Sequence, residues 1–140
     1  MELHRGRLID HIQLVVKDLK ASRRFYEAIF QALDLPIGGS GDDHFWADEL
    51  YVSTPTSPAA QGQLTGRCHL AFQARDRAAV DAFYKAGLAA GGKDNGAPGE
   101  RTRYHPGYYA AYLLDPDGNN IEAVYHGEGK RSAASVTIAF

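Results

Sequence analysis

DHIQLVVKDLKASRRFYEA (residues 10–28) and CHLAFQARDRAAVDAFYKA (residues 68–86) are two versions of one pattern within a chain of 140 residues. Identical residues recur in the two stretches at a constant spacing of 58 positions, with no gap between the matches. They are His11 with His69, Asp18 with Asp76, Phe25 with Phe83, Tyr26 with Tyr84, and Ala28 with Ala86. A constant spacing over many matches indicates a duplicated supersecondary unit.

Each copy opens with residues that alternate between apolar and mixed character, which predicts a strand with two unlike faces. The apolar faces are Ile12, Leu14 and Val16 in the first copy and Leu70, Phe72 and Ala74 in the second. Apolar residues at helical spacing follow, after Asp18 and Asp76 as candidate N-caps. Each helix is expected to pack on the apolar face of its own strand, which leaves the histidine face open.

Weaker strand patterns follow each helix. They cover residues 45–47 and 50–54 in the first copy and residues 108–114 and 120–126 in the second. The DPDG sequence at 115–118 predicts the turn of a hairpin. The tail ASVTIAF (134–140) alternates again, and could add a strand to this subunit or to a partner. The expected fold is α+β, with two tandem βαβββ modules forming a curved sheet around a cup.

We expect a single domain over residues 1–126, with modules at about 7–57 and 67–126 and a tail at 127–140. Apolar residues make up 44% of the chain and charged residues 23%, as in ordinary globular domains. The net charge of −2 argues against a nucleic-acid partner. The sequence has no signal-peptide pattern and no apolar run of membrane-spanning length. Its one cysteine forms no internal disulfide, so a soluble cytoplasmic protein is expected.

Three residues are candidate ligands of a divalent metal. His11 and His69 occupy equivalent positions of the repeat on the open face of each strand, and Glu122 is an acid in the middle of a predicted strand. Two imidazoles and one carboxylate hold a divalent ion and leave coordination positions open for water or substrate. Structural histidines and a solvated glutamate at a sheet edge are the competing interpretation.

Other residues are candidates for the pocket itself. Gln13 and Gln73 are expected to line it, and Trp46 would either line it or pack in the core. The segment 101–108 gathers charged and aromatic residues, among them Arg103 and His105. These two could bind an anionic group and supply an acid–base histidine, or could belong to a solvated loop.

The motifs DHIQLVVKDLKASRRFYEAIF, CHLAFQARDRAAVDAFY and YLLDPDGNNIEAVYH resemble the vicinal oxygen chelate superfamily over roughly residues 7–126. Glyoxalase I, fosfomycin-resistance transferases, bleomycin-binding proteins and extradiol dioxygenases belong to that superfamily. The resemblance implies paired βαβββ modules around a metal, with zinc, nickel, manganese or iron as the ion. It also implies a homodimer and places the ligands at His11, His69 and Glu122. Whether the modules pair within one chain or between two chains stays open.

The resemblance is closer to some members than to others. Glyoxalase I adds a glutamate from the last strand of the first module, whereas LYVSTP (50–55) has no carboxylate. The remaining three-ligand pattern is closer to the fosfomycin transferases and the extradiol dioxygenases. Both have a tyrosine ten positions before the ligand glutamate, which implies that Tyr112 hydrogen-bonds or protonates an oxygen on the metal. The charged loop that grips fosfomycin has no counterpart in APGERTRYHPGYY (97–109).

The sequence therefore favours a metal-dependent enzyme that acts on a small molecule with adjacent oxygens, as a lyase, isomerase or transferase. One alternative is a ring-cleaving extradiol-type dioxygenase with Fe(II). Another is a non-catalytic protein that sequesters an antibiotic or aromatic ligand.

Overall fold

The computed structural model describes residues 2–140 and contains two βαβββ modules of an α+β fold. Two four-stranded sheets have the orders β2-β5-β4-β3 and β6-β9-β8-β7, and β1 and β10 form a two-stranded ribbon. No helix within residues 2–140 is long and apolar enough to cross a membrane. The elements are β1 (Glu2–Arg5), β2 (Ile12–Val15), α1 (Leu19–Ala32), β3 (Gly39–Ser40), β4 (His44–Ala47), β5 (Leu50–Ser53), η1 (Pro58–Ala60), β6 (His69–Gln73), α2 (Arg77–Ala89), β7 (Lys93–Glu100), β8 (Tyr109–Leu114), β9 (Asn120–Tyr125) and β10 (Val136–Ala139).

The chain divides into two compact units. The first unit contains residues up to 19, 37–65 and 130–140, and the second contains residues 20–36 and 66–129. Almost all of α1 therefore belongs with the sheet of the second repeat. The ring of Phe30 in α1 meets Phe72 of β6 edge-on, with 5.2 Å between the ring centroids.

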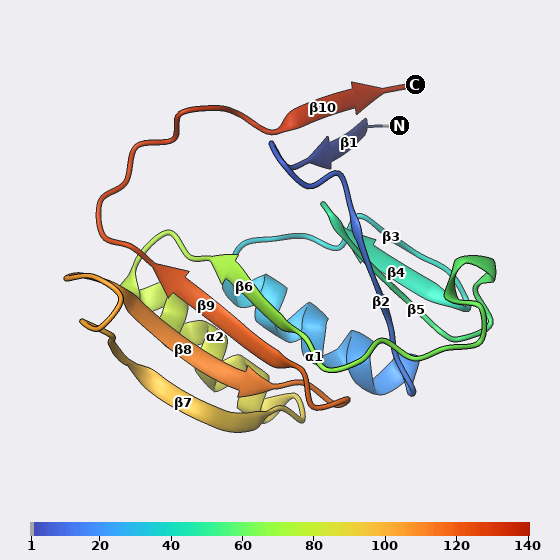
Figure 1. Ribbon diagram of the computed structural model, residues 1–140, viewed down its shortest axis with the longest axis horizontal. Coiled ribbons are helices and arrows are strands. Elements are labelled where there is room, and N and C mark those ends of the chain that lie inside the picture. The colour runs from blue at the N-terminus through green and yellow to red at the C-terminus, as the bar shows by residue number, and fades with distance from the viewer. Residues whose placement is uncertain (1) are drawn as a thin grey trace. The chain divides into compact units, whose positions relative to one another are not determined.

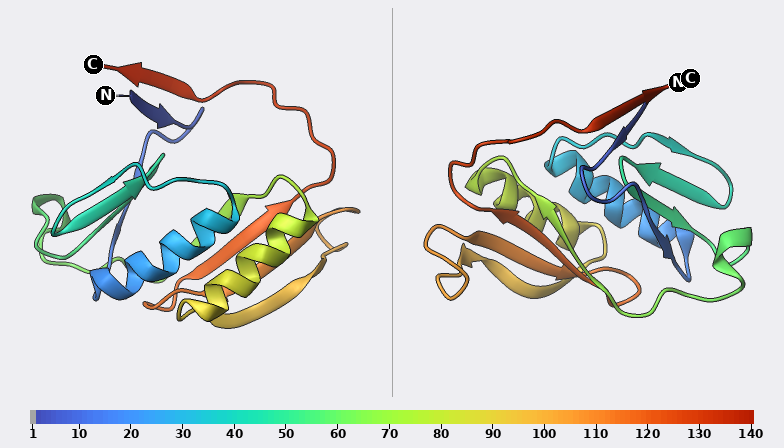
Figure 2. Two further views of the ribbon diagram at one scale, coloured as in Figure 1. Left: turned by 180° about the vertical axis from the view of Figure 1, so that it is seen from behind. Right: turned by 45° about the horizontal axis from the view of Figure 1, so that its top comes forward.

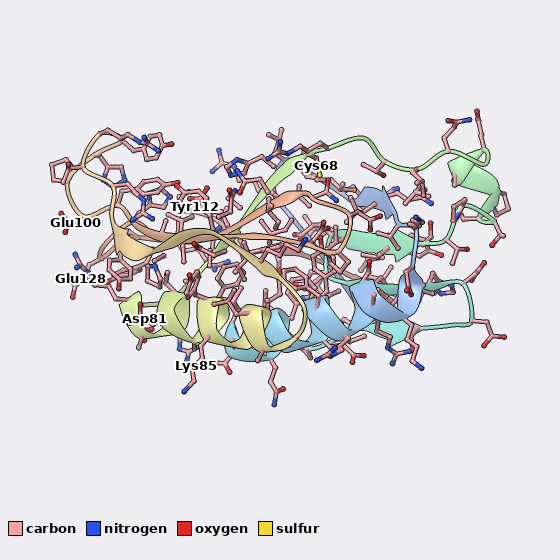
Figure 3. All side chains as sticks on the ribbon, turned by 90° about the horizontal axis from the view of Figure 1, so that it is seen from below. Cys68, Asp81, Lys85, Glu100, Tyr112 and Glu128 are labelled. Atoms are coloured by element: carbon pink, nitrogen blue, oxygen red, sulfur yellow. The ribbon has the colours of Figure 1, made fainter. Side chains whose placement is uncertain are left out.

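In the second unit, α1 and α2 lie on one face of the sheet β6-β9-β8-β7 (Figure 1). A glycine permits their close packing, since a Cβ added at Gly87 would lie 2.2 Å from Leu113 of β8 and 3.0 Å from Ile29 of α1. Leu113 of β8 faces the helices, and its neighbour Tyr112 points to the opposite face of the sheet, away from α2 (Figure 3). The helices thus leave one face of this sheet for other uses.

Local signals in the sequence explain how α2 starts and ends. The carboxylate of Asp76 accepts a hydrogen bond from the amide of Ala79 at 2.7 Å, as expected of an N-cap. Beyond the last turn, Gly91 has a φ of +97°, and the amide of Gly92 donates to the carbonyl of Gly87 at 2.8 Å. A left-handed residue followed by this bond ends a helix without leaving its carbonyls unpaired.

The turn between β8 and β9 is organised by Asp115, which is buried. Its Oδ1 accepts from the amides of Asp117 and Asn119, at 3.0 and 2.8 Å. Its Oδ2 accepts from the Asn119 side chain at 2.9 Å and from the Tyr26 hydroxyl at 2.6 Å. The predicted hairpin is therefore present, and its turn is tied to α1 through Tyr26.

The first unit combines the sheet β2-β5-β4-β3 with the ribbon formed by both ends of the chain. Figure 2 shows β1 and β10 side by side, and the register pairs Leu3 with Ile138 and Arg5 with Val136. The predicted strand in the tail is thus present, and it pairs within the same chain. Leu3 and Arg5 share one face of the ribbon, because they are two positions apart on a strand.

The two sheets repeat one another in register. Gln13 corresponds to Ala71 through the 58-residue spacing, and these residues pair with Tyr51 and Glu122 respectively. On the next strand, Trp46 pairs with Tyr51 as Tyr112 pairs with Glu122. The edge strands contribute glycines, because Gly39 pairs with Trp46 and Gly96 pairs with Tyr112.

Those glycines make room for aromatic rings. A Cβ at Gly39 would lie 2.7 Å from Nε1 of Trp46, and one at Gly96 would lie 2.9 Å from Cδ2 of Tyr112. In each sheet a large ring therefore lies against the backbone of the edge strand, where only glycine permits that approach.

Candidate functional site

Glu122 is a buried carboxylate in the sheet of the second unit. It lies on β9, between β6 and β8, and is only 2% exposed. Its Oε1 is 2.8 Å from Nε2 of His69, and its Oε2 accepts a hydrogen bond from the Tyr108 hydroxyl. Burial of an unpaired carboxylate is costly, so these contacts explain how the sheet accommodates the acid. Two of the three predicted metal ligands are therefore in direct contact.

The ring of His69 is held in position at both nitrogens. Its Nδ1 lies 3.0 Å from Nδ2 of Asn120, which is its neighbour across the β6–β9 ladder. The ring of Tyr112 lies edge-on, with 6.2 Å between the ring centroids. About half of the His69 side chain (49%) is still exposed. The imidazole is thus fixed by its neighbours, and a ligand at Nε2 would replace the bond to Glu122.

Two tyrosine hydroxyls accompany this acid. Burial raises the pKa of Tyr108, and the hydrogen bond to Glu122 raises it further. Burial and then the negative charge of Glu122 raise the pKa of Tyr112. Both hydroxyls therefore keep their protons at neutral pH and act as donors rather than bases. The buried Tyr112 hydroxyl makes no hydrogen bond of good geometry among the described residues, although the Tyr108 hydroxyl is near enough to influence its pKa.

His105 lies next to Tyr108 rather than in contact with the acid. Its ring meets Tyr108 edge-on at 5.4 Å, and its Nδ1 lies 2.8 Å from the carbonyl of Pro106. A carbonyl only accepts, so Nδ1 donates there, and Nε2 accepts from Nδ1 of His126 at 2.8 Å. His105 and His126 thus form a hydrogen-bonded pair at the surface.

The remaining predicted residues of the second unit are exposed. Arg103 donates to the Tyr104 hydroxyl at 3.2 Å, and its guanidinium lies 4.9 Å from the centre of that ring. Gln73 ends β6 on the same sheet face as His69, from which it is four positions away.

Three predicted residues gather in the first unit, around a pocket of about 490 Å³. The lining comprises Leu3, Arg5, His11, Gln13, Trp46, Tyr51, Ser57, Pro58 and Ala59. The amide of Gln13 donates to the hydroxyls of Ser53 and Ser57, at 2.9 and 3.3 Å. Tyr51 stacks on His44, with 5.1 Å between the ring centroids. His11, Gln13 and Trp46 therefore face the same cavity.

His11 has a carboxylate partner of its own. Its Nδ1 lies 2.6 Å from Oδ1 of Asp10, and 62% of the histidine side chain is exposed. The hydrogen bond with His11, followed by the charge of Arg5, holds the pKa of Asp10 below its usual value. Because a carboxylate only accepts, Nδ1 donates here, and in the neutral ring Nε2 is the nitrogen that can bind a ligand. This is the arrangement commonly found at histidines that bind metals.

Sequence reasoning missed several neighbours of the predicted residues. Tyr108 belongs to the segment 101–108 singled out from the sequence, but its contact with Glu122 was not predicted, although it has the same parity as Tyr112 in the predicted strand 108–114. Tyr51 could be recognised only from the register, which shows that it occupies the first-module position equivalent to Glu122. Where a second glutamate would complete the symmetry with Glu122, this chain therefore has a tyrosine. Asp10 contacts His11 and Asn120 contacts His69, but no pattern in the sequence predicted either contact.

The donors at His69 and Glu122 fit a divalent metal. Imidazole nitrogen and carboxylate oxygen are ordinary ligands of zinc, nickel, manganese and iron. Their 2.8 Å separation is that of a direct hydrogen bond, so a bound ion would take the place of this bond. Within neither unit do three or more His, Cys, Asp or Glu side chains of residues 2–140 gather as a metal-binding group.

Paired βαβββ modules, each opening on a histidine, define a glyoxalase-like protein. The chain belongs to the Glyoxalase/Bleomycin resistance protein/Dioxygenase superfamily, whose family model matches residues 8–123. A search of curated proteins gave no significant match.

Solved structures agree with this assignment. A glyoxalase/bleomycin resistance protein from Albidiferax ferrireducens is 31% identical, with a TM-score of 0.73, and the match covers 84% of this chain and 98% of that one. A glyoxalase-related enzyme from Fulvimarina pelagi has 19% identity and a TM-score of 0.70, with coverage of 96% and 99%. A lactoylglutathione lyase from Agrobacterium tumefaciens has 22% identity and a TM-score of 0.61, with coverage of 85% and 93%. The last two matches show a shared fold.

Proposed function

We propose that the protein is a divalent-metal-dependent enzyme of the glyoxalase-like type, which acts on a small molecule with adjacent oxygens. His69 and Glu122 hold the metal, and His11 is the third ligand on the strength of its equivalent place in the repeat. The metal supplies Lewis-acid stabilisation of negative charge that develops on a substrate oxygen. The single observation that carries the proposal is the direct contact between a buried glutamate and a half-exposed histidine.

The surroundings of Glu122 support this role. Tyr108 donates to one oxygen of the carboxylate, while the other oxygen points at His69. Tyr108 therefore fixes the rotamer of the acid and leaves one oxygen for a ligand. The amide nitrogen of Asn120 only donates, so Nδ1 of His69 accepts and Nε2 donates to Glu122. A metal at Nε2 would move that proton to Nδ1, and the Asn120 amide would have to turn its oxygen towards it. Both proposed ligands are thus oriented by neighbours that are not ligands themselves.

Tyr112 is the proposed proton donor to the substrate. Its hydroxyl is buried and without a partner in the described residues, and leaving such a group unsatisfied costs about 1–3 kcal/mol. An oxygen of the substrate would accept this hydrogen bond. The raised pKa of Tyr112 keeps the proton in place until a more basic oxygen develops during the reaction.

The remaining predicted residues have secondary roles in the proposal. Gln13, Gln73 and Trp46 contact the substrate, Arg103 attracts an anionic group, and His105 exchanges protons with solvent. The protein is proposed to work in the cytoplasm as a homodimer. Light scattering on the purified protein tests the oligomeric state.

Two alternatives have observations in their favour. Tyr51 stands where a second glutamate would lie, so the proposed ligands are two histidines and one carboxylate. This set suits Fe(II) and ring-cleaving oxygenation. The aromatic walls at Trp46 and Tyr51 suit a protein that sequesters an aromatic or antibiotic ligand. Oxygen uptake with catechols after anaerobic loading with iron identifies the first. Ligand affinity that survives His11→Ala combined with Glu122→Ala identifies the second.

Elemental analysis of gently purified protein tests the leading proposal. Wild type should contain one divalent metal per chain, and His69→Ala and Glu122→Gln should contain almost none. His4→Ala and Glu128→Gln are matched controls, because both residues are exposed and neither is a proposed ligand. Equal metal content in wild type, His69→Ala and Glu122→Gln would overturn the proposal.

A further inference from the structure

β1, which pairs with β10 in the ribbon, contributes to the pocket of the first unit, although it lies outside residues 8–123 that match the family model. Leu3 and Arg5 of β1 line the pocket together with His11, Gln13, Trp46 and Tyr51. The neighbours Glu2 and His4 are exposed, and they pair with each other at 2.9 Å. One face of the ribbon therefore faces the pocket and the other faces solvent.

Arg5 is fixed in place but keeps free donors. One Nη1 proton goes to the backbone carbonyl of Asp48, and Nε lies 3.7 Å from the Asp10 carboxylate. Only 18% of the Arg5 side chain is exposed. A guanidinium has five N–H groups in a rigid fork, so donors remain for a second, planar acceptor.

The pocket offers hydrogen-bond donors for an anion. Its lining contains the cation Arg5 and the imidazole His11, and it includes no Asp or Glu among the described residues. Carboxylates match the fork of an arginine with two parallel hydrogen bonds. The carboxylate of Asp10, which is not among the lining residues, lies 2.6 Å from His11 and 3.7 Å from Arg5, so an anion would be bound by the free donors of Arg5 rather than by a net positive charge.

The walls of the pocket favour a flat apolar body. The indole of Trp46 lies against two glycines, since a Cβ at Gly38 would be 2.1 Å from Cζ3 of the ring and one at Gly39 would be 2.7 Å from Nε1. Tyr51 is held by its stacking on His44, and Leu3 contributes an apolar wall from the ribbon. These rings are fixed by their neighbours, which lowers the entropy lost when a ligand binds.

We propose that the ribbon is a specificity element, in which Arg5 binds the carboxylate of an aromatic acid while Leu3, Trp46 and Tyr51 hold its ring. The proposal rests on the proposed function, because it names the class of substrate for the same enzyme. It adds that β1, which lies outside the family domain, selects the anionic group of the substrate.

The emission of Trp46, the one tryptophan of the chain, reports binding directly. Full-length protein is titrated with benzoate and with benzamide, its uncharged counterpart. Benzoate should bind about ten times more tightly or better, and Arg5→Met should weaken benzoate about ten- to a hundredfold while benzamide changes by less than about twofold. Arg5→Lys should recover part of the benzoate affinity.

Leu3→Ala is the comparison variant, because it removes ribbon contact without removing charge. It should weaken benzoate and benzamide by the same factor. Equal loss of both probes in Arg5→Met, or no loss of either, would overturn the proposal. All titrations are repeated in the His69→Ala background. If benzoate is still preferred over benzamide in the His69→Ala background, the role of the ribbon is supported whether or not the metal proposal holds. If benzoate is not preferred in either background, the role of the ribbon is rejected and the metal proposal is unaffected.

Discussion

Removal of one buried hydroxyl should weaken the hairpin that positions Tyr112 and Glu122. The Tyr26 hydroxyl donates to the buried carboxylate of Asp115 at 2.6 Å. A hydrogen bond to a charged acceptor contributes about 1.5–3 kcal/mol. In Tyr26→Phe the Asn119 side chain still donates to the same oxygen, so the loss should lie near the middle of that range. We expect the free energy of unfolding to fall by about 2 kcal/mol, and Tm by about 6 °C.

Urea unfolding followed by circular dichroism measures this change. Tyr84→Phe is the matched control, because its hydroxyl donates to Asp94 at 2.9 Å on the surface. It should cost less than about 0.5 kcal/mol. A Tyr26→Phe protein as stable as wild type, or a Tyr84→Phe protein equally destabilised, would refute the assignment of Asp115 as the centre of the turn.

The pH dependence of the difference between wild type and Tyr26→Phe provides a second check. Burial, followed by the charge of Asp115, raises the pKa of Tyr26 well above its ordinary value of 10.0. A group whose pKa is higher in the folded state stabilises the protein fully below its unfolded pKa, and this contribution is lost at higher pH. The difference should therefore stay constant up to about pH 10 and shrink above it. A difference that grows in alkali would contradict the cause assigned here.

Three further predictions follow from the site. Tyr112→Phe removes an unpartnered buried hydroxyl, so Tm should stay equal or rise while kcat falls about a hundredfold; a lower Tm with unchanged kcat would reject the role of proton donor. Gly38→Ala should displace the indole of Trp46, shift its emission and weaken benzoate binding, whereas Gly66→Ala, with open space around it, should do neither; identical emission from all three proteins would show that the ring is not held by the glycine. Removal of metal with a chelator should lower the Tm of wild type, by the equivalent of about 2.7 kcal/mol where the metal had been at a hundred times its Kd. The Tm of Glu122→Gln should not respond to the same chelator, and an equal fall in both proteins would place the stabilising ion elsewhere.

The repeat made much of the fold predictable. The 58-residue spacing and the alternating strands predicted both modules, and the Asp76 cap and the turn at Asp115 had local sequence signals. These features depend on neighbours within a few residues. A pattern in the sequence therefore reflects them directly.

Other strands have no such pattern. β7 (Lys93–Glu100) contains Gly96, Pro98 and Gly99, and its pairing with β8 shifts register twice. Irregular pairing removes the alternation by which a strand is recognised. β1 has only four residues and depends on β10, at the other end of the chain. Pairing over such a distance leaves no local signal.

Part of the site could also be predicted from patterns in the sequence. Glu122 was recognisable because an acid is unusual in the middle of a strand, and His69 because it repeats His11. Tyr51 resembled an ordinary strand residue until the register placed it opposite Gln13. The contribution of Arg5 depends on the ribbon, so no reading of residues 8–123 alone could have found it.

Anomalous diffraction from crystals loaded with zinc tests the central claim most directly, because it locates the ion. We predict one strong peak at about 2.0–2.2 Å from Nε2 of His69, from an oxygen of Glu122 and from His11. A peak at the surface pair of His105 and His126, with His69 and Glu122 still bonded to each other, would contradict the account.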